Sequence, residues 1–171
     1  MDGECCCCSV DGIEPEIDAS KASAQSRDSV AETSCPSCGE RGRPVRRETL
    51  KTMLVVSLRR VPDGEFLFCD SQQCSAVYFS RESRYSFEVD DMREHVYQKE
   101  PAEADTLVCY CFQHSVGAFQ SASSEERAAI ADDITLGTKI GQCACELRNP
   151  QGSCCLGNVH GLIRRLDAVR T

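Results

Sequence analysis

The spacing of the cysteines constrains the fold of this chain more than any other feature. The chain has 171 residues, of which 14 are cysteine, a content at which cysteine becomes informative about fold class. Four cysteines form a run at residues 5–8, and the others occur as five close pairs: Cys35 and Cys38, Cys69 and Cys74, Cys109 and Cys111, Cys143 and Cys145, and Cys154 and Cys155. Clustered thiols cross-link small proteins as disulfides or as metal ligands. We therefore expect small modules that are held partly by something other than core packing.

The start of the sequence favours metal ligands over disulfides. A secreted disulfide framework usually follows a signal peptide with a basic first region, whereas residues 1–4 are acidic and the cysteine run at 5–8 is too short to be an apolar signal segment. The longest apolar runs, such as residues 53–56, are far shorter than the about 20 residues of a membrane-spanning helix. We expect a cytoplasmic protein without a membrane span, in which paired cysteines hold metal.

Composition divides the chain into four segments. Residues 1–34 contain eight acidic and two basic residues, which account for most of the net charge of −8, and we expect a disordered acidic tail. Residues 35–98 predict a β-rich module, because β-prone runs at 65–68 and 76–79 flank Cys69 and Cys74. Residues 99–106 are polar and contain Pro101, as in a linker. Residues 107–171 predict a helical module.

The predicted fold class is therefore α+β, with a β module before a helical one. Helices are expected at 115–119, 125–134 and 156–166, where apolar residues of the last segment recur at helical spacing. Residues 49–58 fit a short helix or a strand equally well. Arg164 and Arg165 suit the C-terminal end of the last helix, where cations are favoured.

The first two close pairs predict a structural zinc site. Cys35 and Cys38 have the C-x-x-C spacing that lets two thiolates reach one ion from a tight turn, and Cys69 and Cys74 offer a second pair from a hairpin-like turn. Four thiolates from two turns make a closed tetrahedral site. The alternatives are a disulfide or a redox pair, but a thioredoxin-like C-x-x-C opens a helix, whereas Gly39 and Gly42 follow here at once.

The later cysteines predict a second metal site of a different kind. Cys109 and Cys111 form a C-x-C, which is tighter than a zinc knuckle, and Cys143, Cys145, Cys154 and Cys155 follow. An iron–sulfur cluster takes four thiolates, so six thiols are available for one [2Fe–2S] site. Cys109 and Cys111 would hold one iron, and two of the last four cysteines would hold the other. A second zinc is the alternative.

Several motifs resemble the cysteine-rich domain of CopZ-type copper chaperones. Residues 145–157, Cys-Glu-Leu-Arg-Asn-Pro-Gln-Gly-Ser-Cys-Cys-Leu-Gly, resemble its C-terminal signature, and Cys109-Tyr110-Cys111-Phe112 resembles its C-Y-C-F start. The zinc-binding half is matched by Cys35-Pro36-Ser37-Cys38, Thr49-Leu50-Lys51, Phe68-Cys69, Cys74 and Val77-Tyr78-Phe79. The resemblance covers residues 35–166. The second half also resembles bacterioferritin-associated ferredoxin, a small helical [2Fe–2S] module.

The resemblance implies one Zn²⁺ on Cys35, Cys38, Cys69 and Cys74, and one [2Fe–2S] cluster on Cys109, Cys111, Cys145 and Cys155. The last two residues form the C-x9-C pair of the family pattern, and Cys155 would lie at a helix N-terminus, which favours an anionic ligand. Cys143 and Cys154 are the alternative ligands. The chain lacks the M-x-C-x-x-C loop of the heavy-metal-associated domain that such chaperones carry. The run at residues 5–8 either binds a soft ion such as Cu(I) or is a low-complexity tail without a dedicated ion.

These features predict a metal-binding electron-transfer protein linked to copper handling, through reduction or delivery of metal ions. The chain has no G-x-S-x-G, P-loop or G-x-G-x-x-G motif, so we do not expect an enzyme. The resemblance implies a protein redox or metal-transfer partner, such as a separate copper-binding domain or a copper-transporting ATPase. The alternatives are a structural zinc-ribbon interaction module and a nucleic-acid-binding module that uses residues 41–60, which contain seven basic residues and one acidic residue. Because the chain is acidic and aromatics are not interleaved with these cations, we expect no nucleic-acid binding.

Overall fold

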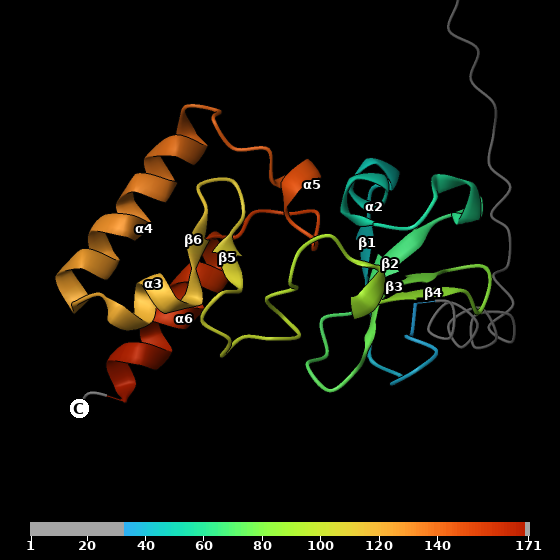
Figure 1. Cartoon of the computed structure of the whole chain (residues 1–171), viewed down its shortest axis with the longest axis horizontal. Helices are drawn as coiled ribbons and strands as arrows, with labels where there is room; N and C mark the ends of the chain where they lie inside the picture. Colours follow the sequence, from blue (N-terminus) through green and yellow to red (C-terminus); the bar gives the residue numbers. More distant parts are fainter. Residues whose placement is uncertain (1–32, 170–171) are drawn as a thin grey trace, which may run out of the picture.

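The structure, a computed structural model, describes residues 33–169. The acidic tail predicted for residues 1–34 and the cysteine run at 5–8 lie outside these residues, apart from Thr33 and Ser34. The described part is α+β, as the sequence predicts: a β-sheet region comes first and helices follow (Figure 1). Within residues 33–169, no helix is long and apolar enough to cross a membrane.

The first module is built on a four-stranded antiparallel sheet. Its strands are β1 (Arg43–Val45), β2 (Phe66–Phe68), β3 (Ala76–Ser80) and β4 (Ser86–Glu88), and they lie in the order β1-β2-β3-β4. The two β-prone runs of the sequence are β2 and β3, which pair directly. Two short 3-10 helices, η1 (Leu58–Arg60) and η2 (Val89–Asp91), lie in the connections.

Alternation along the strands gives the sheet two different faces, since successive side chains of a strand point to opposite sides. One face packs against helix α2 (Arg47–Met53) in a core that includes Leu50, Met53, Phe66, Phe68, Tyr78 and Phe87. Leu67 and Phe79 belong to a separate buried cluster that also contains Cys35, Cys69 and Cys74. Three of the four predicted thiol ligands thus belong to the second, smaller core of this module, and the fourth, Cys38, is exposed.

The ambiguous stretch at residues 49–58 is helical only in its first half. Helix α2 ends at Met53, and Leu54 is extended and forms an isolated bridge with Met92. The buried Leu50, Met53 and Leu54 have helical spacing, but the β-branched Val55 and Val56 that follow favour extended backbone. Tertiary pairing with Met92 fixes the point at which the helix gives way to extended chain.

The second module combines a small hairpin with three helices. Strands β5 (Leu107–Cys109) and β6 (His114–Ser115) pair antiparallel, and the helices are α3 (Val116–Ser121), α4 (Ser124–Lys139) and α6 (Leu156–Ala168). Their apolar faces share one core, which includes Val108, Phe119, Ile134, Val159 and Leu162. The three predicted helices correspond to α3, α4 and α6. Helix α4 begins with a capping box formed by Ser123 and Glu126, a common start signal.

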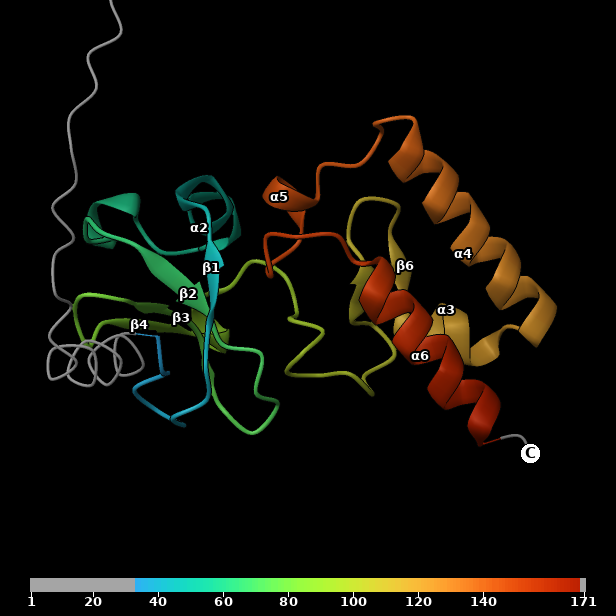
Figure 2. The same cartoon turned by 180° about the vertical axis from the view of Figure 1, so that it is seen from behind.

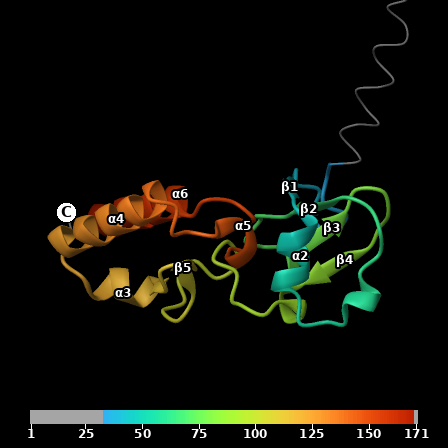
Figure 3. The ribbon, with the colours of Figure 1, turned by 90° about the horizontal axis from the view of Figure 1, so that it is seen from above.

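One short helix of the second half lies against the first module. Helix α5 (Cys145–Arg148) packs on α2, and the chain then returns to the second module as α6 (Figures 1 and 2). Seen from above, α5 stands between the sheet and the bundle of α4 and α6 (Figure 3). The helical module predicted for residues 107–171 is therefore in contact with the β module through its own cysteine-bearing segment.

The polar stretch at residues 99–106, predicted as a linker, begins and ends on buried side chains. Lys99 is 8% exposed and Thr106 is 1% exposed. The Lys99 ammonium group donates to the backbone oxygen of Ser71, at 2.8 Å, so this connection is fixed to the first module. Just before it, Tyr97 belongs to the core of the second module.

Candidate metal centres

Four sulfur atoms converge at the end of the β2–β3 hairpin. The Sγ atoms of Cys35 and Cys74 are 3.9 Å apart, and those of Cys38 and Cys69 are 3.6 Å apart. All four lie within 4.8 Å of one another. Tetrahedral zinc with bonds of about 2.3 Å to sulfur requires ligand sulfurs about 3.8 Å apart. The four thiols predicted from the sequence therefore have the separation that one zinc ion needs.

Two backbone turns bring these thiols together. In the first turn the amide of Gly39 donates to the oxygen of Cys35, at 2.8 Å. Gly39 has φ +79°, a conformation that other residues adopt only with strain. In the second, the amide of Cys74 donates to the oxygen of Ser71, and the amide of Cys69 donates to Val77 across the hairpin. Both turns are properties of local sequence, which is why spacing alone identified them.

The electrostatics of this site call for a cation. Burial raises the pKa of the Cys69 thiol to about 12 and also raises the pKa of Cys74. Desolvation acts in the same direction at Cys38, but the backbone N–H of Glu40 and the neighbouring thiols outweigh it, so the pKa of Cys38 is lowered. Four thiolates are therefore not stable together in this pocket without positive charge. A bound dication supplies that charge and displaces the protons.

The second group of predicted ligands also comes together. Cys109 ends strand β5, Cys111 lies in the turn to β6, Cys145 begins α5, and Cys155 is the N-cap of α6. The Sγ atoms of Cys111 and Cys145 are 3.7 Å apart. The amide of Ala144 donates to the Cys111 sulfur at 3.3 Å. Cys109, Cys145 and Cys155 are buried, and Cys111 is half-buried.

The thiol of Cys155 is the centre of this second group. Its hydrogen bond lowers the pKa of Cys109 to about 7 and the pKa of Cys145 to about 5. The same two hydrogen bonds raise the pKa of Cys155 itself, so in the metal-free protein Cys155 keeps its proton although it stands at a helix N-terminus. Burial raises the pKa of Cys111 to about 11. The pKa values of these neighbouring thiols are thus displaced in opposite directions.

One close sulfur–sulfur approach in this group joins cysteines that are far apart in the sequence. The Sγ atom of Cys111 lies beside that of Cys145, and the Cys155 thiol interacts with both Cys109 and Cys145. That Cys109 and Cys111 share an iron stays a prediction. Cys109 is in strand β5 with its side chain in the core, whereas Cys111 lies in the turn that follows and is partly exposed.

The remaining two thiols lie at the edge of this group. Cys143 is half-buried and Cys154 is exposed. Each interacts with Cys145: the Cys143 thiol helps to lower its pKa, and desolvation together with Cys145 raises the pKa of Cys154. Three of the four thiols of the family pattern are thus more buried than Cys143 and Cys154, whereas Cys111 is half-buried like Cys143.

The two groups differ in compactness. Within residues 33–169, the first four cysteines are the only set of three or more Cys, His, Asp or Glu residues whose ligand atoms all lie within 4.8 Å of one another. A single tetrahedral zinc needs that compactness. Within the described residues, the second group is not gathered that closely. A centre with two metal atoms accommodates ligands that are farther apart than those of a single ion.

A hydrogen-bonded turn that the ligand spacing did not predict joins Cys145 to Cys155. Asn149 is 1% exposed, and its amide donates to the oxygen of Ser153 at 2.7 Å. Gln151 donates to the oxygens of Ser153 and Cys154, and it accepts from Asn158 on α6 and from Gln98. The sequence contains the residues of this turn as the string Asn-Pro-Gln-Gly-Ser. Their role could not be predicted, because it depends on hydrogen bonds to backbone oxygens whose positions the sequence does not reveal.

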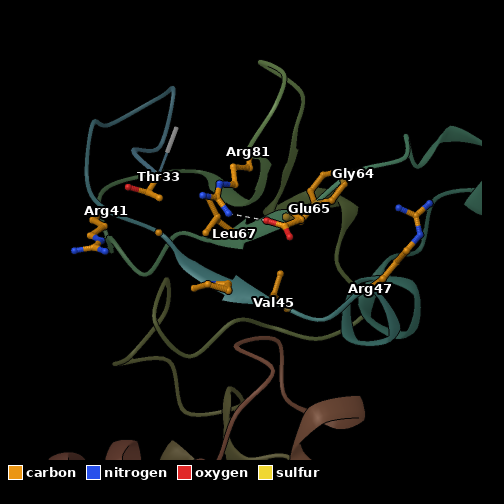
Figure 4. Close-up of a pocket in the computed structure, with 11 residues that line it drawn as sticks. Thr33, Arg41, Val45, Arg47, Gly64, Glu65, Leu67 and Arg81 are labelled. Carbon is orange, nitrogen blue, oxygen red and sulfur yellow. Dashed lines mark hydrogen bonds and ion pairs between the residues drawn. The ribbon is translucent and has the colours of Figure 1, made fainter. Parts of the chain in front are cut away.

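A second feature of the first module is a pocket with several arginines, none of whose lining residues is a cysteine. A pocket of about 510 Å³ runs beside β1 and is lined by Arg41, Arg47, Arg81 and Glu65, among others (Figure 4). Arg81 is ion-paired with Glu65 at 2.7 Å, and Arg47 is paired with Asp63 at 3.1 Å. Much of the positive charge here is therefore balanced within the protein.

Comparison with known proteins agrees with the geometry of the first site. Residues 32–93 match the CopZ-type family described as a zinc binding domain. The chain is 30% identical over 121 residues to the copper chaperone CopZ of Archaeoglobus fulgidus, a match that covers 71% of this chain. The chain spans only 57% of the length of that relative.

A solved structure extends the likeness to the second module. The X-ray structure of the Archaeoglobus fulgidus CopZ N-terminal domain superposes with a TM-score of 0.61 at 25% identity, over 75% of this chain and 96% of that domain. The part of the chain that holds the four converging thiols is therefore similar to a zinc binding domain of the CopZ type.

Proposed function

We propose that this protein is a metal-binding electron-transfer protein that carries a [2Fe–2S] cluster on Cys109, Cys111, Cys145 and Cys155 and a structural zinc in its first module. The observation that carries the proposal is the convergence of these four thiols from β5, its turn, α5 and α6. A [2Fe–2S] cluster bound there would supply one reversible electron. We propose a carrier of electrons or metal ions, not an enzyme.

The residues around the second group suit such a cluster. Val108, Phe119 and Val159 are fully buried in the adjoining core, and an apolar surrounding limits access of water and tunes reduction potential. The Ala144 amide donates to the Cys111 sulfur, which is a second means of tuning the potential. The partly exposed Cys111 and the exposed Cys154 mark the side from which an electron partner could approach.

The alternative of a second zinc is less well supported. A lone tetrahedral ion needs four sulfurs about 3.8 Å apart, and within the described residues only the first group is gathered that closely. The alternative of nucleic-acid binding is opposed by charge. The apo chain already has a net charge of −8, and each four-thiolate site adds a formal charge of about −2. This balance favours a basic protein partner.

The link to copper rests on likeness to the Archaeoglobus fulgidus copper chaperone. We propose that the protein reduces or delivers copper ions together with a protein partner, such as a separate copper-binding domain or a copper-transporting ATPase. All ten cysteines within residues 33–169 are free thiols, which supports our expectation of a reducing compartment such as the cytoplasm.

Anaerobic purification followed by a visible spectrum and by iron, sulfide and zinc analysis tests this proposal. We expect red-brown protein with about two irons, two sulfides and one zinc per chain. Colourless protein with about two zinc ions, and no iron after reconstitution with iron and sulfide, would contradict it.

A matched pair of variants then tests the ligand set. Cys145→Ser should lose most of the visible absorbance, because Cys145 begins α5 within 3.7 Å of Cys111. Cys143→Ser, two positions earlier at the edge of the group, should retain the absorbance. The opposite result would assign Cys143 as the ligand.

A further inference from the structure

The segment that joins two of the proposed cluster ligands rests on the zinc module. Residues 145–155 begin with Cys145 in α5 and end with Cys155 at the start of α6. Between these ends the segment leaves the helical bundle and lies against α2 (Figures 1 and 2). The contacts are specific hydrogen bonds between side chains of the first module and backbone oxygens of the segment.

Two threonines of α2 donate to the end of α5. Helix α5 is a single turn, so its last carbonyls have no partner within the helix. The Thr49 hydroxyl donates to the oxygen of Glu146 at 2.5 Å, and Thr49 is fully buried. The Thr52 hydroxyl lies 2.8 Å from the oxygen of Leu147, with Glu48 and Thr49 oxygens of its own helix as further acceptors. Thr49 and Thr52 are three residues apart and so share one face of α2.

A tyrosine of the zinc hairpin holds the next part of the segment. The Tyr78 hydroxyl donates to the oxygen of Pro150 at 2.6 Å, and both residues are buried. Tyr78 lies in β3, four residues after the predicted zinc ligand Cys74. The β2–β3 hairpin that carries Cys69 and Cys74 therefore also carries a contact to the cluster-ligand segment.

The fit between the segment and α2 leaves no spare space. Gly152 lies in the left-handed region, with φ +65°. A Cβ atom placed there would be 3.1 Å from both the Thr49 hydroxyl oxygen and Val45 Cγ2. The segment is thus contacted by three hydroxyl groups, of which those of Thr49 and Tyr78 donate to it, and it packs closely at a residue without a side chain.

We propose that the zinc module positions Cys145 and Cys155, with Thr49, Thr52 and Tyr78 as the positioning residues. This inference rests on the proposed function, because it assigns the zinc module a role at the proposed cluster. It adds that the zinc module does more than stabilise its own fold: its hydroxyl groups set the path of the chain between two cluster ligands. Loss of these hydroxyls should loosen the segment and change the surroundings of the cluster while zinc stays bound.

Amide hydrogen–deuterium exchange of the zinc-loaded, iron-free protein tests whether the segment is held. The variants are Thr49→Val with Thr52→Val, and Tyr78→Phe, which remove hydroxyls and keep side-chain shape. We expect exchange in residues 145–155 to rise about fivefold or more, the effect of one lost hydrogen bond. Thr135→Val is the matched control, because its hydroxyl bonds only to Ala131 in its own helix α4. Unchanged exchange in both hydroxyl variants would overturn the proposal.

The iron-loaded protein tests whether this positioning reaches the cluster. In the threonine double variant we expect a shifted reduction midpoint and visible circular dichroism, with one zinc retained. The variant Thr49→Ser with Thr52→Ser keeps both hydroxyl donors, so its reduction midpoint and visible circular dichroism should match those of the wild type. If the threonines acted only through their methyl groups, this variant would not restore the two signals. Signals identical to wild type in the valine variant would overturn the role at the cluster. A wild-type chain that binds no iron would refute the proposed function, while the exchange result still decides whether the segment is held.

Discussion

Gly152 shows how much of the contact between the modules depends on single residues. Its backbone is in the left-handed region, and it faces Thr49 and Val45 at close range. Tyr110 is a comparable residue in the second module, between the two thiols of the C-x-C. Its hydroxyl donates to the oxygen of His95 at 2.8 Å and accepts from the amide of Tyr97 at 3.0 Å. The left-handed backbone limits the choice of residue at Gly152, and the two hydrogen bonds of the hydroxyl limit it at Tyr110.

Gly152→Ala should destabilise the protein by ~1–2 kcal/mol, the cost of left-handed backbone for a residue with a Cβ. The close contact with Thr49 and Val45 adds to this cost. Urea unfolding gives the measurement. Gly157→Ala is the control, because a Cβ at Gly157 in α6 meets nothing within 4 Å. The control should be neutral or stabilising, since alanine favours helix. Equal losses in the two variants would contradict this explanation.

Tyr110→Phe should cost about 1–3 kcal/mol, because it leaves the buried amide of Tyr97 without its acceptor. Tyr110 is only 2% exposed, so water does not readily replace the hydroxyl. Thermal unfolding of the zinc-loaded protein measures the change. Tyr85→Phe, at a ring that is 36% exposed, is the comparison and should have little effect. A Tyr110→Phe protein as stable as wild type would show that these hydrogen bonds add nothing.

At the scale of elements, the helices of the second module differ in what stabilises them. Helix α4 has a capping box, in which the Ser123 hydroxyl accepts from the amide of Glu126 and the Glu126 carboxylate accepts from the amide of Ser123, at 2.7 Å. Helix α5 is a single turn with no side-chain N-cap, and its carbonyls depend on α2. A helix such as α4 can be predicted from its own sequence, whereas α5 requires its neighbour.

Ser123→Ala should lower the free energy of unfolding by ~1 kcal/mol, the usual contribution of an N-cap. Ser124→Ala, one position later, is the neighbouring control, although it also removes a hydrogen bond to Asp167. Circular dichroism during urea unfolding provides the measurement. If the two alanine variants lose the same stability, the capping box is not the cause.

The same box predicts a dependence on acidity. The backbone amide of Ser123 and then its hydroxyl lower the pKa of Glu126 below its ordinary value. Because the folded pKa is depressed, this stabilisation is present above the unfolded pKa and is lost as the pH falls through the folded one. Glu126→Gln should therefore flatten the acid side of the stability profile relative to wild type. Parallel profiles for the two proteins would contradict the assignment.

At the scale of the whole molecule, the two modules are joined by more than the connection between them. Lys99 is bonded to Ser71 of the zinc hairpin, and Tyr97 in the same connection is bonded to Arg165 of α6. Helix α5 returns from the second module to α2. Cys69 and Cys74 flank the turn of the hairpin that carries Tyr78. Continuous contacts therefore connect the first group of thiols to the second group.

Removal of zinc should lower the unfolding temperature of the whole described part and increase exchange in residues 145–155. Binding of zinc to such a site contributes directly to folding. The unfolding temperature is measured before and after addition of a zinc chelator. The amount of zinc that the chelator removes is measured in the same experiment. Added Zn²⁺ should restore the transition, and Mg²⁺ should not, because thiolates are soft ligands. An unfolding temperature that is independent of zinc would contradict a structural role for the ion.

The sequence predicted the features that depend on local spacing. The C-x-x-C and the second pair at 69 and 74 identified the thiols that converge at the hairpin, and helical periodicity identified α6. That Cys109, Cys111, Cys145 and Cys155 hold one cluster stays a prediction. The close approach of the Cys111 and Cys145 sulfurs could not be predicted from spacing, because these residues are 34 positions apart and meet only through the fold.

The α+β class and the four thiols of the first group could be predicted from the sequence, because turns and periodic elements arise from residues close together along the chain. The position of α5, in contrast, depends on tertiary contacts. Its contacts join residues about a hundred positions apart, such as the Thr49 hydroxyl and the Glu146 oxygen. A threonine that donates to a distant carbonyl cannot be told from the sequence apart from one that donates to its own helix. This contact can therefore be recognised only in the folded chain.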